Sequence, residues 1–341
     1  MSGSLFSASA YIQLHTLVGH SDTINSLSFS KDGTHLASGG DDQSVIIWNT
    51  LKGQLLYRVM FEDAVDCVLW HPVHPETIIA GLVSGYMFQV DGFSLLHHHK
   101  YDIRVGVRTT IYCLDYDVST GCLAIGMGEE VHLTREVKRN NYDGDLVLPR
   151  PSEPERMNEG GDTRLRAISV KFYTDGTQLV VSYMAHGVIC WDISAPEPSQ
   201  LWRIAMPKES PHIGGSALSP DYRHIALYNA VDGVDLYVAG QGVKQEARIK
   251  YLLDKPPQSK HQLQVQFIHA GQALVCGTTT GTVRLWETGS GEILQELAHG
   301  GKYSLNLCYC PFLWRHSYIA AGTVDKGQRT YIKVWRAKIS E

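Results

Sequence analysis

Residues Gly19 to Asn49 read GHSDTINSLSFSKDGTHLASGGDDQSVIIWN, and this stretch decides the fold. Apolar residues fall in three short runs that end near Phe29, Gly40 and Trp48. The sequences KDGT and DDQ separate the runs, and Asp and Gly tolerate the backbone angles of a tight reversal. Three strands in about thirty residues leave no room for a crossover helix, so neighbouring strands must be antiparallel. The stretch therefore predicts a β-meander.

Four side chains of this meander resemble the signature of the WD40 β-propeller family. In that family a His after Gly, a Ser or Thr in the middle strand, an Asp in the next turn and a Trp form a hydrogen-bonded set. His20, Ser38, Asp42 and Trp48 occupy those places here. The resemblance implies a structural role, because such a set satisfies polar groups that are costly to bury alone. A hydrolase interpretation of the Ser, His and Asp is disfavoured, because the family geometry places them inside the blade wall.

Similar but degraded segments recur along the chain at the family's expected period of roughly 40 to 45 residues. The seven positions equivalent to the Trp are Trp48, Val90, Thr134, Trp191, Tyr237, Trp286 and Trp335, with spacings by subtraction of 42, 44, 57, 46, 49 and 49. They predict an all-β fold, a seven-bladed β-propeller of four-stranded antiparallel blades. Phrases such as LAIGMGEEVHLTREV and HGVICWD also resemble divergent single-propeller WD40 proteins of basidiomycete fungi.

The last blade, which contains Trp335, has only three predicted strands of its own. Residues 11–18, YIQLHTLV, have strand composition and directly precede Gly19. We expect this N-terminal strand to pair beside the last blade and close the ring. Closure of this kind removes two exposed sheet edges that would invite aggregation.

One domain is expected over residues 1–341, with a flexible N-terminus at 1–10. The longest spacing marks an insertion from Arg135 to Arg164. Within it, Asp145 to Leu148 fits an outer strand, and 149–164 fits a mobile surface loop. That loop could dock a partner or be phosphorylated at Ser152; the alternative is a solvated loop without function.

Composition and charge exclude several functional classes. A formal charge of −5 and a pI near 6.3 argue against nucleic-acid binding through bulk electrostatics. The seven cysteines lack CxxC spacing, which favours reduced thiols in a cytoplasmic or nuclear protein. No signal peptide or membrane span is recognised. We expect protein or peptide partners, and neither nucleic acid nor membrane.

Chemical motifs are weak in this chain, so we expect no cofactor. The run His97-His98-His99 could suggest a metal, but in a strand only His97 and His99 share a face. Cys308 and Cys310 also share one face, without a third ligand. Phosphate-loop, GxSxG and HExxH patterns are absent from the sequence.

The rim of the ring is the remaining candidate site. WD40 proteins generally bind partners on the face whose loops lead into each innermost strand. Transferred to this chain, the resemblance gives Thr23, Asn25, Asp41, Asp66, Thr110, Tyr112, Arg166, His212, His261 and Tyr303. Polar residues with aromatic anchors are common at interfaces. We therefore predict a non-catalytic scaffold or adaptor that uses this face and the long loop. The alternatives are an enzyme with a site in the central channel, although mostly small and apolar residues are expected there, and a histone-tail reader, for which Tyr112 and Tyr303 could contribute to an aromatic cage.

Overall fold

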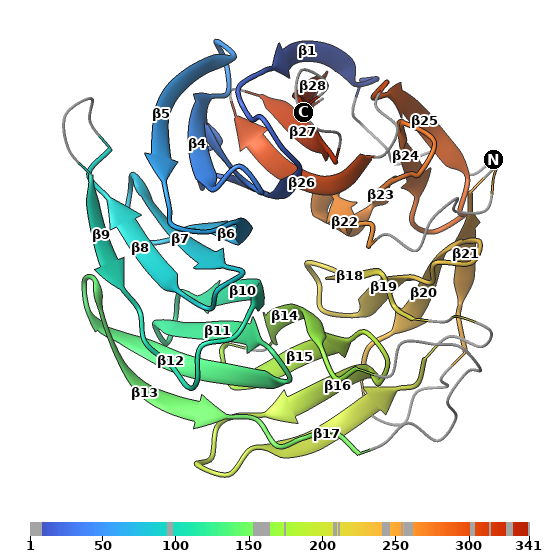
Figure 1. The fold of residues 1–341 in the computed structure, drawn as a ribbon. Coiled ribbons are helices and arrows are strands. Elements are labelled where there is room, and N and C mark those ends of the chain that lie inside the picture. Colours follow the sequence, from blue (N-terminus) through green and yellow to red (C-terminus); the bar gives the residue numbers. More distant parts are fainter. Residues whose placement is uncertain are drawn as a thin grey trace.

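Seven antiparallel sheets of four strands each form a closed ring in the computed structural model (Figure 1). The structure describes residues 9–93, 98–152, 164–173, 175–206, 210, 212–240, 246–253, 255, 262–300, 304–313, 315–324 and 330–339. The predicted all-β, seven-bladed propeller is thereby confirmed.

Each blade is an up-and-down meander whose first strand lies nearest the ring centre (Figure 1). Blade one contains β2 (Ile24–Phe29), β3 (His35–Gly40), β4 (Ser44–Asn49) and β5 (Gln54–Met60). Blade two contains β6 (Val65–Trp70), β7 (Thr77–Leu82), β8 (Met87–Asp91) and β9 (His99–Asp102). Blade three contains β10 (Ile111–Asp117), β11 (Cys122–Met127), β12 (Glu130–Lys138) and β13 (Asn141–Val147). Blade four contains β14 (Ala167–Tyr173), β15 (Gln178–Tyr183), β16 (Gly187–Asp192) and β17 (Ser199–Ile204).

The remaining three blades follow the same order. Blade five contains β18 (Gly215–Leu218), β19 (His224–Tyr228), β20 (Gly233–Val238) and β21 (Ile249–Leu252). Blade six contains β22 (Val265–Ile268), β23 (Ala273–Gly277), β24 (Thr282–Glu287) and β25 (Ile293–Ala298). Blade seven contains β26 (Ser304–Leu313), β27 (His316–Thr323), β28 (Ile332–Lys338) and β1 (Ile12–Leu17). No helix among the described residues is long and apolar enough to cross a membrane; the one present there, η1 (His269–Gly271), is a single turn.

All seven Trp-equivalent positions lie on the third strand of their blades, as the sequence spacing predicted. Each is paired with an apolar residue of the second strand: Leu36 with Trp48, Ile78 with Val90, Leu123 with Thr134, Leu179 with Trp191, Ile225 with Tyr237, Leu274 with Trp286 and Ile319 with Trp335. The register therefore survives where the Trp itself is lost, because the alternation of side chains between the two faces is enough to keep a strand in place.

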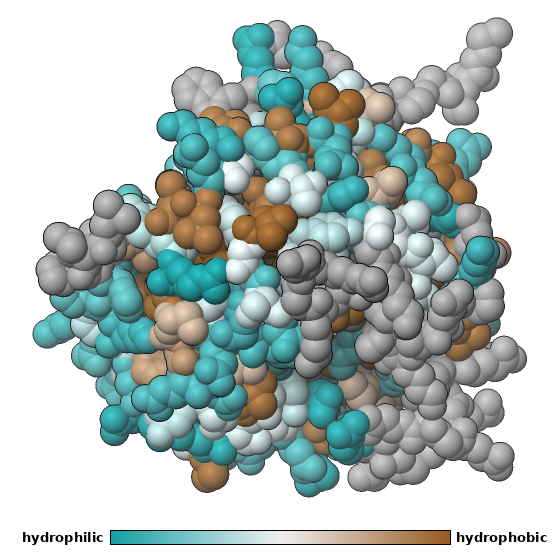
Figure 2. All heavy atoms as spheres, turned by 45° about the horizontal axis from the view of Figure 1, so that its top comes forward, coloured by the Kyte–Doolittle hydropathy of each residue, from teal (hydrophilic) through white to brown (hydrophobic). Residues whose placement is uncertain are grey.

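The hydrophobic core is divided among the junctions between blades. At one junction, Ile46 and Trp48 of blade one pack with Cys308, Tyr318 and Val334 of blade seven. A separate cluster of buried residues occupies each of the other six junctions. On the face shown in Figure 2, hydrophobic side chains form small separate groups among hydrophilic ones. Each blade thus buries its apolar surface only against its two neighbours.

The N-terminal strand closes the ring, as predicted. β1 pairs antiparallel with β28, with Ile12 opposite Arg336 and Leu17 opposite Ile332. Immediately before β1, the Tyr11 hydroxyl contacts Ser317 Oγ at 2.8 Å and His269 Nε2 at 2.9 Å. The strand is therefore tied to its own blade and to blade six.

The insertion is shorter than the sequence indicated. Arg135 to Lys138 continue β12, and β13 begins at Asn141 instead of Asp145. The two strands are joined by a two-residue hairpin in which Asn140 has φ 64°, a conformation that Asn tolerates. Of the predicted mobile loop and flexible N-terminus, 153–163 and 1–8 lie outside the described residues.

Candidate functional site

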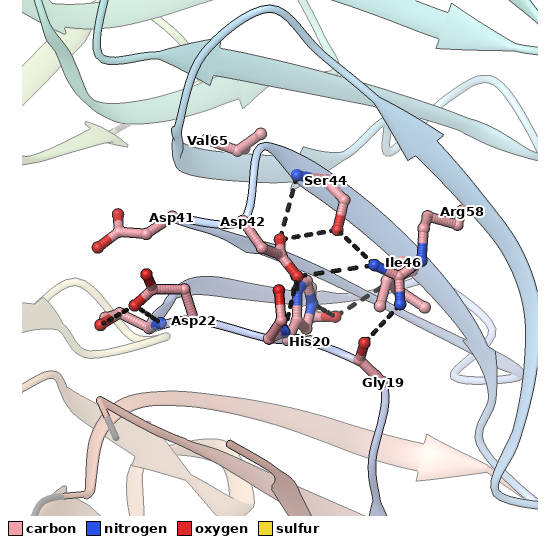
Figure 3. A network of polar contacts seen from close by, with 12 residues as sticks. Gly19, His20, Asp22, Asp41, Asp42, Ser44, Ile46, Arg58 and Val65 are labelled. Carbon is pink, nitrogen blue, oxygen red and sulfur yellow. Dashed lines mark hydrogen bonds and ion pairs between the residues drawn. The ribbon is translucent and has the colours of Figure 1, made fainter. Parts of the chain in front are cut away.

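The four signature side chains of blade one form a connected chain of contacts, of which Figure 3 shows His20 beside Asp42. His20 Nδ1 lies 2.9 and 3.0 Å from the two carboxylate oxygens of Asp42. His20 Nε2 lies 2.7 Å from Ser38 Oγ, and Trp48 Nε1 donates to the same oxygen at 2.8 Å. The chain of contacts links the segment before β2 to strands β3 and β4.

Asp42 also accepts hydrogen bonds from its own turn. Ser44 Oγ donates to it at 2.8 Å and the Ser21 amide at 3.0 Å, and Arg58 lies 3.7 Å away. Burial alone would raise the pKa of Asp42, but the contact with His20 and these donors lower it to about 2. The carboxylate therefore stays ionised and holds the turn in place.

Burial argues against a hydrolytic role for this set. Ser38 is 0% exposed and His20 is 5% exposed, so the Ser hydroxyl has no open approach for a substrate. The geometry supports the structural role that the resemblance implied.

The propeller has one face that carries the turns between second and third strands and the loops leading into each innermost strand. We call it the entry face. Asp41 lies here and its side chain points away from the His20–Asp42 contact (Figure 3). Asn25 donates to Asp41 Oδ1 at 2.7 Å and to the Val65 carbonyl at 3.1 Å, which bridges blades one and two.

Three further predicted residues, Asp66, Tyr112 and Arg166, take part in electrostatic interactions across blades two to four. Burial and the nearby Asp41 raise the pKa of Asp66 to about 6, against the opposing effect of Arg166. The Arg166 guanidinium lies 4.4 Å from the centre of the Tyr112 ring. Residues from blades one to four thus influence one another at the inner edge of the entry face.

The other predicted face residues divide into three kinds. Thr23 and Thr110 donate to the carbonyls of Val324 and Val83 at 3.3 and 2.9 Å, so they fasten loops together. His212 is buried at 5% exposure and is not available on the surface, because its loop folds inward and the neighbouring Ile213 amide bonds to blade four. His261 and Tyr303 lie outside the described residues.

The sequence analysis missed a second aromatic–arginine pair on the entry face. The Arg108 guanidinium lies 3.5 Å from the centre of the Tyr86 ring, and Arg108 also pairs with Asp102 at 3.5 Å. The neighbouring Val107 is 84% exposed. The available signal was that Tyr86 occupies the turn between β7 and β8, the equivalent in blade two of the turn that holds Asp41.

A polar cluster at the opposite face was also missed. Glu136 of β12 lies 3.0 Å from His74 Nε2 and 3.3 Å from His71 Nε2, both in the turn after β6. The Tyr116 hydroxyl and the Asn140 amide donate to it at 2.9 and 3.0 Å. Burial alone would raise the pKa of Glu136, but the donors Asn140 and Tyr116 and the two histidines lower it. The carboxylate therefore connects blades two and three.

Two His and a Glu at these distances could hold a metal ion in principle. The tautomer of His71 opposes this interpretation. Its Nδ1 accepts from the amides of Val73 and His74 at 3.2 and 3.1 Å, so the proton of the neutral ring is on Nε2 and points toward Glu136. A metal-bound Nε2 would require the proton on Nδ1, against two N–H donors. We therefore interpret the cluster as a hydrogen-bonded junction.

The earlier metal candidates give no ligand set among the described residues. His98 and His99 are exposed near the start of β9, and His97 lies outside the described part of the chain. Cys308 and Cys310 are buried in the core between blades seven and one. All seven cysteines are free thiols.

Comparison with known proteins places a repeat on blade one. The family model "WD domain, G-beta repeat" matches residues 12–49, from β1 to β4. The human Intraflagellar transport protein 122 homolog is 44% identical over 139 residues, which is 40% of this chain and 10% of that protein. The Ribosome biogenesis protein BOP1 homolog of Drosophila persimilis is 40% identical over 62 residues, 18% of this chain and 8% of the relative. The Ribosome biogenesis protein ERB1 of Yarrowia lipolytica is 35% identical over 72 residues, 19% of this chain and 9% of the relative.

The matching repeat and the seven four-stranded blades together support a WD40 β-propeller. The matched region is only about a tenth of the length of these relatives. The similarity therefore covers part of this propeller and only a small part of each relative. The more specific resemblance to basidiomycete proteins stays a prediction.

Proposed function

We propose that this protein is a non-catalytic scaffold or adaptor that binds proteins or peptides through the entry face and the adjoining long loop. The observation that carries the proposal is the pair of aromatic–arginine contacts, Tyr86 with Arg108 and Tyr112 with Arg166. Tyr and Arg are enriched among the residues that contribute most to binding energy. Tyr86 lies in the tight turn between β7 and β8 and Tyr112 on the innermost strand β10 of the closed ring, so these anchors lose little conformational entropy on binding.

Apolar and acidic groups accompany these anchors. Val107 extends into solvent beside Arg108, and Asp41 and Asp66 lie toward blade one. A mixture of aromatic, Arg and acidic side chains suits a peptide with both apolar and charged residues. The closed ring supplies the rigid support for this arrangement.

The alternatives gain less support. Arg166 covers one side of Tyr112, so this ring is a poor wall for an aromatic cage around a methylated lysine. The innermost strands β10 and β14 carry Asp115 and Lys171, whose side chains pair at 2.7 Å. The mostly small and apolar channel lining stays a prediction. An ion-paired carboxylate without a second acid in contact is nevertheless weak support for catalysis.

We infer partners in the cytoplasm or nucleus. The free cysteines are typical of a reducing compartment. The relatives are named for intraflagellar transport and ribosome biogenesis, and work in an assembly of proteins would suit the scaffold proposed for this chain. We expect neither nucleic acid nor membrane to be the direct partner, given the acidic overall charge.

The test is affinity purification with quantitative mass spectrometry from the source cells. One bait is wild type and another combines Asp41→Ala, Asp66→Ala and Arg166→Ala. The matched control combines Glu197→Ala, Glu292→Ala and Arg223→Ala, which removes the same charges from exposed turns on the opposite face. All three proteins must first show the same melting temperature.

The proposal expects a set of proteins that the entry-face variant loses and the control retains. Equal recovery by all three baits would contradict the chosen face. Recovery of no specific protein by any bait would contradict the scaffold function, and a screen for small-molecule turnover would then test the enzyme alternative.

A further inference from the structure

Ser152 is an exposed serine held by an arginine of the neighbouring blade. Arg203 Nη1, from the outer strand β17, donates to Ser152 Oγ at 2.9 Å and to the Ser152 carbonyl at 3.4 Å. Arg203 Nη2 donates to the His186 carbonyl at 2.8 Å. The guanidinium is therefore fixed on blade four with one edge presented to the serine hydroxyl.

The segment that leads to Ser152 is fixed on blade three. Arg150 Nη2 lies 3.4 Å from Oε2 of Glu129, which belongs to the turn between β11 and β12. The flanking residues Pro149 and Pro151 line a pocket of about 120 Å³ together with Tyr183 of blade four. Proline restricts the backbone, so the hydroxyl of Ser152 is presented from a stiff, extended stretch that crosses the junction of the two blades.

We propose that Ser152 is a phosphorylation site and that Arg203 is the residue that binds the phosphate. A protein kinase would transfer the γ-phosphoryl group of a nucleoside triphosphate. Ser152 Oγ forms a bond to phosphorus and loses its proton to a base of the kinase, while the bond to the bridging oxygen breaks and a nucleoside diphosphate leaves. The hydroxyl is exposed and its hydrogen bond with Arg203 lies at the surface, where water can replace it when a kinase binds.

The modified side chain would gain more than the hydroxyl loses. A phosphoserine carries a charge of about −1.5 to −2 and three acceptor oxygens, and a guanidinium binds such a group through two parallel hydrogen bonds. Arg203 already has the position and the anchor for this contact, and Arg150 is a second cation two residues away. Phosphorylation would therefore fasten the start of the long loop to blade four, beside the entry face.

The experiment uses the full chain with phosphoserine introduced at position 152 during translation. A ³¹P NMR titration measures the second pKa of the phosphate in wild type, Arg203→Lys and Arg203→Ala. Pairing with Arg203 should lower this pKa by about one unit relative to Arg203→Ala, from an unpaired value of about 6. Arg203→Lys should fall between, since lysine supplies charge without the planar fork. A control phosphoserine at Ser119, whose hydroxyl donates to Asp117 at 2.6 Å, should show no lowering.

A second measurement tests whether the site is used. The tagged chain is isolated from source cells with phosphatase inhibitors, and the peptide containing Ser152 is analysed by mass spectrometry, with Ser152→Ala as the control. Phosphate on Ser152 together with a pKa that depends on Arg203 supports the proposal. A phosphate pKa unchanged in Arg203→Ala overturns the role of Arg203, and Ser152 found only unmodified overturns the modification site.

Discussion

At the scale of single residues, polar side chains that are buried between strands must be satisfied by one another. Asp42 receives hydrogen bonds or ion pairs from a ring nitrogen, a hydroxyl, an amide and a guanidinium. Glu136 does the same between blades two and three, with partners in the turn after β6 and in strand β10. Asp42 thus joins segments within blade one, and Glu136 adds a polar contact to a junction that also has an apolar cluster.

Removing the Asp42 carboxylate should destabilise the whole propeller. Asp42→Ala leaves His20 Nδ1 and the Ser44 hydroxyl without their acceptor, and we expect the free energy of unfolding to fall by about 2 kcal/mol. The adjacent Asp41 is exposed, so Asp41→Ala should cost no more than about 0.5 kcal/mol. Urea denaturation of both variants measures the difference. Equal losses would show that the His20–Asp42 contact has no special structural role.

Stability should fall in mild acid because of His71. Burial lowers the pKa of His71 to about 4, while an unfolded histidine titrates near 6.5. Between these values the unfolded chain binds more protons than the folded one, so the free energy of unfolding decreases as the pH falls from about 6.5 to about 4. His71→Asn keeps an acceptor for the two amides but does not titrate. Urea denaturation at pH 7 and pH 5 should show a smaller loss for the variant than for wild type, and equal losses would exclude His71 as the cause.

At the scale of the element, the closing strand depends on one side chain at its start. The Tyr11 hydroxyl contacts Ser317 and His269, and its backbone N–H and carbonyl both bond to the Gln295 side chain at 2.8 Å. Strand β1 itself has exposed residues at Ile12 and Gln13. Its attachment therefore relies on Tyr11 and the pairing with β28 more than on its own apolar face.

Tyr11→Phe should consequently loosen the closing strand while leaving the fold intact. Removal of the hydroxyl deletes its contacts with Ser317 and His269, and we expect a loss of about 1 to 2 kcal/mol. Amide hydrogen exchange should increase in β1 and β28 before it increases elsewhere. Tyr222→Phe, at a half-exposed turn, is the control and should change neither quantity. Uniform exchange across all blades in Tyr11→Phe would contradict a local latch.

The sequence predicted the positions of the strands better than the side-chain contacts between blades. The third strands were located even at Val90 and Thr134, because alternation and turn residues are local signals. The contact of His71 with Glu136 joins a turn of blade two to a strand of blade three that is far away in sequence, and no local pattern encodes it. The same holds for Tyr86 with Arg108, whereas the burial of His212 depends on how its loop folds over blade four.

At the scale of the whole molecule, the division of the core among blade junctions makes every blade depend on two neighbours. No blade has a core of its own among the described residues, so stability comes from interfaces that all require the ring to be closed. β1 supplies the fourth strand of blade seven and then continues into blade one through Val18 and Gly19. Closure thus has two parts, a strand pairing and a covalent connection.

A circular permutant can separate the two parts. Ser9 N–H bonds to the Lys338 carbonyl, so residues 19–339 followed by a short Gly-Asn turn and residues 9–18 would give blade seven four consecutive strands. We expect this permutant to unfold cooperatively within several degrees of wild type, because the β1–β28 ladder and its burial are retained. Deletion of residues 1–18 should melt far lower, since it exposes the edge of β28 and the core beneath Leu17. Circular dichroism melting compares wild type, the permutant and the deletion. A permutant as unstable as the deletion would show that ring closure depends on the Val18–Gly19 connection and not on the pairing of β1 with β28.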